Sequence, residues 1–252
     1  VSSGNASILV PEPFGSNNNA QTISASITLN DPLTIDNSTA AVGKDLTLSG
    51  VISGTGSITK TGAAQVVFSG TTANTYSGTT TVSAGTLQLS KTAGVNAIGG
   101  NLNVSGGTAL LINSNQILDS KSVTVVSGTF DIDGKTEAVA GVQLIGGSIS
   151  GSGAGSLTSA SDYDVQAGSI SAVLAGTVGL TKTTNGIVSL SGVNTLTGKT
   201  TITGGVLSIS AETGLGGNPA GFTADQLTLN GGTLRTTASV VIDDMIDFRT
   251  VF

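Results

Sequence analysis

Three groups of acidic residues hold most of the side chains in this sequence that could do chemistry. In the first group, Asp131 and Asp133 stand two positions apart and Glu137 follows. Closely spaced carboxylates are ligands that calcium prefers, but a complete calcium loop needs ligands at further fixed positions and a bidentate Glu at its twelfth. Those ligands are missing here, and the period of two in a strand places Asp131 and Asp133 side by side on its outer face. We therefore expect a solvated strand face.

The other two groups are the dense cluster of Asp243, Asp244 and Asp247 and the pair Asp162 and Asp164. The dense cluster suits calcium or a partner, although a polar face on a terminal cap explains the same residues. Glycoside cleavage needs two carboxyl groups that face each other across the scissile bond. Two carboxylates in one short turn do not give that arrangement, so we expect no glycosidase site at Asp162 and Asp164.

Cysteine and histidine are absent from all 252 residues. The chain therefore offers no disulfide, no thiolate nucleophile, no Cys/His metal site and no imidazole for acid–base work. The net charge of −6, with nine Lys and Arg scattered singly, argues against nucleic acid as a partner. The sequence thus predicts no catalytic residue, no cofactor-binding residue, no metal ligand and no cofactor.

Short apolar runs that alternate with a period of two indicate an all-β chain. The 37 Gly residues, with many Ser, Thr and Asn, place a turn after almost every run, and aromatic residues make up only 3%. The core must therefore consist of thin aliphatic layers. No stripe with a helical period is long enough to predict a helix, and the nearest, Val240–Phe252, suits a capping helix or two more strands. The runs include Leu33–Ile35, Leu46–Leu48, Val66–Phe68, Leu102–Val104, Val123–Val125, Val188–Leu190, Thr201–Thr203 and Leu227–Leu229.

One stretch, Gly54–Ser90, returns in degenerate form at Gly176–Ser210. Each copy contains a Thr-Lys-Thr segment, around Lys60 in the first and Lys182 in the second, and each ends on a Gly-x-Leu-x-x-Ser pattern. The two copies are about 120 residues apart, and small insertions between otherwise similar strands are what the loops of a solenoid permit.

We predict a parallel β-helix of roughly ten to twelve coils, each of about 20 to 25 residues, rather than a sandwich or a barrel. Sandwiches and barrels close their cores with longer strands and larger side chains. The predicted organisation has three parts. Residues 1–32 form an N-terminal arm or cap plus the first strand, residues 33–240 form the β-helix with its internal repeat, and residues 241–252 form a C-terminal cap or last rung.

The repeated stretch also resembles a known family. Its TKTG, FSG, NTYSGTTTV and AGTL segments within Gly54–Ser90 are similar to the autotransporter-associated β-strand repeat, found in passenger domains of bacterial autotransporters. The resemblance picks up again in the second copy and covers most of residues 33–240. It implies a right-handed parallel β-helix, export across the outer membrane and display at the bacterial cell surface. Neither a signal peptide nor a translocator barrel is visible, so membrane attachment is expected only through a part outside this chain.

Asn74 and Asn194 stand at matching places in the two copies, each followed two positions later by Tyr76 or Leu196. Asn caps turns with its side chain and tolerates left-handed backbone, so a turn role is enough to explain it. The replacement of Tyr76 by Leu196 favours packing over recognition.

Three functions remain from the sequence. The first is a non-catalytic extracellular structural or adhesive module, a rigid stalk that meets an unknown ligand on a host or a neighbouring cell. The second is a subunit that polymerises with its own copies through the end coils, since open strand edges recruit strands. The third is an enzyme like the parallel β-helix polysaccharide lyases, with Arg235 or Arg249 as the basic catalytic residue beside acidic calcium ligands; we expect this least.

Overall fold

The computed structural model describes residues 4–10, 20–38, 45–219 and 225–242. The chain divides into two compact units, Val1–Asp131 and Ile132–Phe252, which are treated separately below. Within the described residues, no helix is long and apolar enough to cross a membrane.

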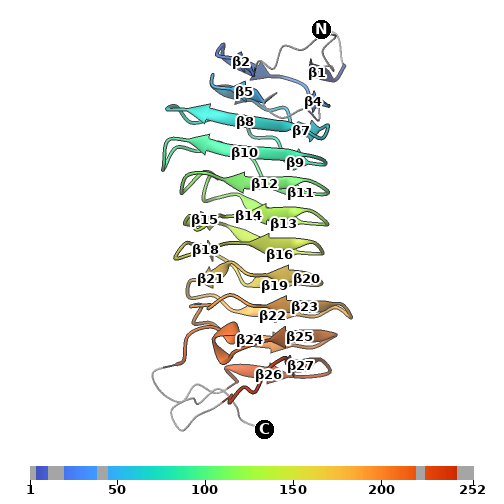
Figure 1. Ribbon diagram of the computed structural model, residues 1–252, viewed down its shortest axis with the longest axis vertical. Helices are drawn as coiled ribbons and strands as arrows, with labels where there is room; N and C mark the ends of the chain where they lie inside the picture. Colours follow the sequence, from blue (N-terminus) through green and yellow to red (C-terminus); the bar gives the residue numbers. More distant parts are fainter. Residues whose placement is uncertain (1–3, 11–19, 39–44, 220–224, 243–252) are drawn as a thin grey trace. The chain divides into compact units, whose positions relative to one another are not determined.

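The first unit is built from short parallel strands that visit two sheets in turn (Figure 1). One sheet has the order β1-β4-β7-β9-β11-β13, the second has the order β2-β5-β8-β10-β12-β14, and β3 pairs with β6. The bounds are β1 Ala6–Val10, β2 Gln21–Ile23, β3 Ile27–Leu29, β4 Leu33–Asn37, β5 Leu46–Leu48, β6 Ile52–Gly54, β7 Ile58–Thr61, β8 Gln65–Gly70, β9 Thr80–Val82, β10 Thr86–Lys91, β11 Leu102–Val104, β12 Thr108–Leu111, β13 Ser122–Val125 and β14 Thr129–Asp131.

The second unit repeats this plan. Its sheets have the orders β16-β19-β22-β24-β26, β17-β20-β23-β25-β27 and β15-β18-β21. The bounds are β15 Glu137–Val139, β16 Gly141–Leu144, β17 Ser148–Ser150, β18 Ser156–Ser159, β19 Tyr163–Val165, β20 Gly168–Ile170, β21 Val173–Ala175, β22 Leu180–Lys182, β23 Ile187–Leu190, β24 Thr200–Ile202, β25 Val206–Ile209, the 3-10 helix η1 Glu212–Leu215, β26 Leu227–Leu229 and β27 Thr233–Thr236.

In each unit, strands that are neighbours in a sheet are one circuit of the chain apart and pair in parallel. The pairs of β8 with β10 and of β23 with β25 show this arrangement in the two units. A chain that returns to the same sheet once per circuit is a solenoid, so the predicted all-β parallel β-solenoid is confirmed. The handedness, the number of coils and the three-part division at residues 32 and 240 stay predictions.

The core consists of columns of aliphatic and aromatic side chains stacked in register. In the first unit, Leu48, Phe68, Leu89 and Leu111 are Cα partners on successive strands, and each has at most 1% of its surface exposed. Burying such a side chain contributes about 1.5–3 kcal/mol. The period-two alternation of the sequence therefore translates directly into buried and outward-facing positions.

Left-handed glycines make the tight turns between the sheets. Gly62, which follows β7, has φ +74°. A Cβ at this position would lie 2.3 Å from the carbonyl oxygen of Asn37 in the preceding coil. Only glycine fits both this backbone conformation and this approach between coils.

Candidate functional site

The polar side chains of the repeat lie inside the solenoid, where they bind its backbone. Lys60, in β7, is fully buried. Its Nζ donates to the carbonyl oxygens of Thr61 and Gly62 at 2.7 Å each and to that of Ala84 at 3.0 Å. Burial lowers the pKa of Lys60 from 10.5 to about 8, and the charge of Asp36 partly opposes this shift. The ammonium thus closes a turn and reaches the next one.

Lys182, in β22 of the second unit, occupies the matching position and is also fully buried. Its Nζ donates to the carbonyl oxygens of Thr184 and, at 3.2 Å, Gly204. Burial lowers the pKa of Lys182, and the charge of Asp164 raises it in part. The two copies of the repeat therefore use lysine in the same way.

Asn74 bridges three coils of the first unit. Its Oδ1 accepts a 2.9 Å hydrogen bond from the backbone N–H of Ile52, and its Nδ2 donates a 2.8 Å bond to the carbonyl oxygen of Ala97. Asn194 does the same in the second unit. Its Oδ1 accepts from the N–H of Leu174 at 2.9 Å, and its Nδ2 donates to the carbonyl oxygen of Gly214 at 2.8 Å.

The sequence predicts a turn role for Asn74 and Asn194, which would involve only neighbouring residues of the same coil. The structure places both side chains in the interior, with 3% and 2% of the surface of Asn74 and Asn194 exposed, and joins each of them to coils before and after its own.

Tyr76 and Leu196 are both buried in the core, as the expectation of a packing role requires. The phenol of Tyr76 lies 2.5 Å from the hydroxyl oxygen of Thr80. Burial raises the pKa of Tyr76 well above its usual range. This side chain therefore presents no surface for recognition.

The two carboxylates considered for glycoside cleavage bind the scaffold. Asp162 Oδ1 accepts a 2.7 Å bond from the N–H of Gly179. Asp164 Oδ2 accepts from Nε2 of Gln143 at 2.7 Å and of Gln166 at 3.0 Å. The expectation that both lie in one short turn is wrong, because β19 begins between them and contains Asp164. Their hydrogen bonds are internal, as a structural role requires.

The acidic residues of the DIDG segment do not share one strand face. β14 ends at Asp131, and Asp133 lies in a turn with φ +39°. The predicted side-by-side placement on a strand is therefore wrong, since the strand stops before the second aspartate. Glu137, in β15, is fully buried. Among the described residues, no three His, Cys, Asp or Glu side chains are grouped so that they could hold a metal ion.

The basic residues considered for a lyase are only partly described. Arg235, in β27, donates from Nε to the hydroxyl oxygen of Ser208 at 3.2 Å. Arg249 and the cluster of Asp243, Asp244 and Asp247 lie outside the described residues, as does most of Val240–Phe252.

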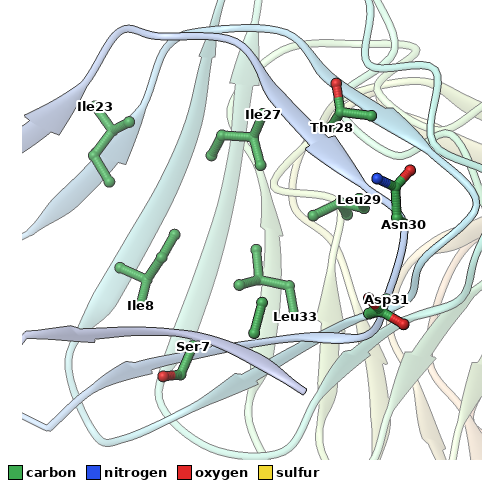
Figure 2. Close-up of a pocket in the computed structure, with 10 residues that line it drawn as sticks. Ser7, Ile8, Ile23, Ile27, Thr28, Leu29, Asn30, Asp31 and Leu33 are labelled. Atoms are coloured by element: carbon green, nitrogen blue, oxygen red, sulfur yellow. The ribbon is translucent and has the colours of Figure 1, made fainter. Parts of the chain in front are cut away.

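An apolar cavity of about 460 Å³ opens at the first coil of the first unit (Figure 2). Ile8, Ile23 and Ile27 line it together with the buried Leu29 and Leu33. These isoleucines point inward in the columns that continue as Ile35, Leu48 and Ile52, so the cavity is the part of the solenoid interior that the described residues do not cover at the first coil.

Sequence reasoning did not assign a role to Lys91 and Gln116, which form a further buried contact. Gln116 Oε1 accepts a 2.8 Å bond from the N–H of Lys91, and Lys91 Nζ donates to the carbonyl oxygen of Ser69 at 2.8 Å. Burial lowers the pKa of Lys91. The alternation of side chains along a strand could have indicated that such lysines point inward. Lys91 stands an even number of positions from the inward Leu87 and Leu89 and therefore lies on the same face of β10.

Comparison with known families finds a match in each unit. Residues 58–89 and 180–209 match the passenger-associated-transport-repeat family, a repeat of autotransporter passengers. No curated protein and no solved structure matches the chain. The two matched segments contain the lysine and asparagine pairs described above, so the suspected resemblance to autotransporter passenger repeats is confirmed.

Proposed function

We propose that the chain is a non-catalytic structural or adhesive module displayed outside a bacterial cell, where a stiff solenoid carries outward loops. The observation behind this proposal is that, in the described part of the chain, several side chains that could do chemistry are hydrogen-bonded to the backbone of the solenoid. Lys60, Asn74 and Asp162 all bind backbone atoms of neighbouring coils or turns. The two matches to a passenger repeat support export and surface display. A right-handed coil with ten to twelve turns belongs to the same proposal.

The mechanism is mechanical. Parallel backbone ladders and stacked aliphatic columns repeat the same contacts from coil to coil, and in this proposal they give the solenoid its stiffness. Side chains such as Asn74 add hydrogen bonds across coils. Contact with a host or a neighbouring cell would then fall to outward loops, whose sequences are free to vary.

The test is a panel of acidic and neutral glycans incubated with the purified chain and calcium, followed by analysis for chain scission and unsaturated products. No turnover is expected. Turnover that is lost in an Arg235→Gln variant and kept in a Lys199→Gln variant would replace this proposal with the lyase alternative. Binding without cleavage supports the adhesive form of the module.

The cavity at the first coil favours a second candidate, polymerisation with another copy through the end coils. Ile8 and Ile23 line an interior that the described residues leave open at the first coil. At the last described coil, Leu229 lies in register with the inward Ile202 and has 44% of its surface exposed. The last described coil of a second copy, which carries the exposed Leu229, would cover this interior and continue its aliphatic columns.

Electron microscopy and sedimentation of purified variants test this candidate. Ile8→Asp is expected to abolish filaments, whereas Leu9→Asp is expected to keep them, because Leu9 is 63% exposed on the opposite face of the same strand. Discrete single particles of the wild-type chain at high concentration would exclude polymerisation.

A further inference from the structure

A charged side chain stands in an aliphatic column in each unit. In the first unit, Lys60 is the Cα partner of Ile35 on one side and of Val82 on the other, and it is fully buried. In the second unit, Lys182 is the partner of Ile202 and is equally buried. Removing an ammonium from water is costly unless it finds hydrogen-bond partners. A column of this kind would accept leucine or valine, so the lysine needs a separate explanation.

The partners of the ammonium supply that explanation. Lys60 Nζ donates to Thr61 and Gly62 in the turn that ends its own strand and to Ala84 in the corresponding turn of the next coil. An ammonium has three N–H donors, so each of its donors can meet one carbonyl oxygen. Asp36, on the neighbouring β4, is the acidic residue whose charge acts on this group.

The second unit reproduces the arrangement independently. Lys182 Nζ donates to Thr184 in its own turn and to Gly204 in the turn of the next coil, while Asp164 on β19 is the nearby acidic residue. Even the adjoining backbone bond is the same. The N–H of Ser83 donates to the carbonyl oxygen of Lys60 at 2.9 Å, and the N–H of Thr203 donates to that of Lys182 at 2.9 Å.

We propose that Lys60 and Lys182 are ammonium clamps. Each carries N–H donors into the interior that tie the turn of its own coil to the turn of the next. The oxygens around each Nζ, three carbonyls at Lys60 and two carbonyls with the Thr184 hydroxyl at Lys182, form a binding site for a primary ammonium ion that the chain fills with its own side chain. The ammonium group, and not the alkyl chain, holds the two turns together. This inference does not depend on the extracellular role proposed above.

The first test is the Lys60→Met variant, which keeps the volume of the side chain and removes its donors. Hydrogen exchange of the N–H groups of Ala64 and Ser83, which donate to Asn37 and Lys60 in these turns, is expected to accelerate about tenfold or more, because a hydrogen bond from a charged donor is stronger than one from a neutral donor. The N–H of Val126, which donates to Val104, serves as the internal reference. Unchanged exchange at Ala64 and Ser83 would overturn the proposal.

The second test is chemical rescue of Lys60→Ala. n-Propylammonium supplies the atoms that this variant lacks from Cγ to Nζ, and it is expected to slow exchange at Ser83 back toward the wild-type rate. Tetramethylammonium, which has the charge but no N–H group, and 1-propanol, which has the alkyl chain but no charge, are expected to do less at equal concentration. Equal rescue by all three would show that filling space is sufficient, which contradicts the clamp.

The matched control and the backup variant come from the same chain. Lys199→Met removes an exposed lysine and is expected to leave exchange at Thr203 unchanged. Lys182→Met is expected to accelerate exchange at Thr203, so the second unit answers the same question if Lys60→Ala does not fold. Equal exchange at Thr203 in both methionine variants would overturn the clamp there.

Discussion

The Nζ of Lys60 lies 3.0 Å from the carbonyl oxygen of Ala84, which is 24 residues further along the chain. The bond joins two turns that are separated by a full coil. Parallel strands already connect successive coils through their backbones, but the turns lie outside those ladders. A side chain that reaches from one turn to the next therefore adds to the few backbone bonds between turns, such as that from the N–H of Ser83 to the carbonyl oxygen of Lys60.

The asparagine bridge predicts a large loss on truncation. Asn74→Ala removes two hydrogen bonds and leaves the buried N–H of Ile52 and the carbonyl of Ala97 without this partner. Each buried group left unsatisfied costs about 1–3 kcal/mol, so we expect the two groups together to give a destabilisation of about 2–6 kcal/mol. The urea midpoint measures it. Asn103→Ala is the control, because Oδ1 of Asn103 has no hydrogen-bond partner among the described residues; similar midpoints for the two variants would contradict the bridge.

The lowered pKa of Lys60 predicts a pH dependence of definite sign. Between about 8, its value in the folded chain, and 10.5, its ordinary value, the unfolded state holds more protons than the folded state. The contribution of this group to stability therefore increases as pH rises through that window. The unfolding free energy of the wild type is expected to increase relative to that of Lys60→Met as the pH rises from 8 to 10.5. A shift in the opposite direction would contradict the assignment.

Two glycines separate the cost of backbone conformation from the cost of crowding. Gly62 and Gly153 have φ +74° and +65°, but a Cβ at Gly62 would lie 2.3 Å from a carbonyl oxygen, whereas a Cβ at Gly153 would meet nothing within 4 Å. Gly153→Ala is expected to cost about 1–2 kcal/mol, which is the cost of the left-handed conformation alone. Gly62→Ala is expected to cost clearly more in the same thermal or urea unfolding measurement. Equal costs would show that the coils separate freely at Gly62.

The two tyrosines are expected to differ when their hydroxyls are removed. Tyr163 Oη lies 2.6 Å from the carbonyl oxygen of Leu157 and 2.8 Å from that of Ala175, and it accepts from the N–H of Ser159 at 3.1 Å, whereas Tyr76 Oη contacts the Thr80 hydroxyl and the backbone of Gly99. Tyr163→Phe removes a hydroxyl that contacts three backbone groups, so it is expected to destabilise the chain by about 2–3 kcal/mol and Tyr76→Phe by about 1 kcal/mol. Urea unfolding checks the order of the two variants.

Ultraviolet titration gives a second reading of Tyr163. Burial raises the pKa of Tyr163 to about 12, against the 10.0 of an exposed phenol. Folded protein is therefore expected to show no tyrosinate absorbance from this residue near pH 10, and the Tyr76→Phe variant isolates its signal. Half-ionisation near pH 10 in the folded state would contradict the buried hydrogen-bonded placement.

The fold could be predicted from the sequence because side-chain parity and turn residues carry it. In Ile58–Thr61 the pattern alternates buried and partly exposed positions, as the period of two requires. The same parity places Lys60 inward beside Ile58, so its burial was readable. Its contact with Ala84 was not, because that depends on the length of the intervening coil and on how the two turns line up.

The misplaced aspartates show where sequence reasoning fails locally. A period of two was extended from Asp131 to Asp133, but the chain leaves the strand after Asp131 and turns with φ +39° at Asp133 and +68° at Gly134. Asp-Gly is itself a turn signal, and here it outweighs the alternation. The bridging role of Asn74 was missed for a related reason: its partners Ile52 and Ala97 lie in other coils, where local turn chemistry gives no information.

The recurrence of the lysine and the asparagine in both units has a consequence for how the length of such chains can evolve. Each repeat segment brings its own inward lysine and its own bridging asparagine, and the partners of both are mainly backbone atoms. Backbone atoms are present whatever the neighbouring side chains are. An in-frame crossover between the two segments would add or remove about 120 residues and would keep an inward lysine and a bridging asparagine in each remaining segment. Genes for such chains could then change length by recombination without new partners having to evolve for these side chains.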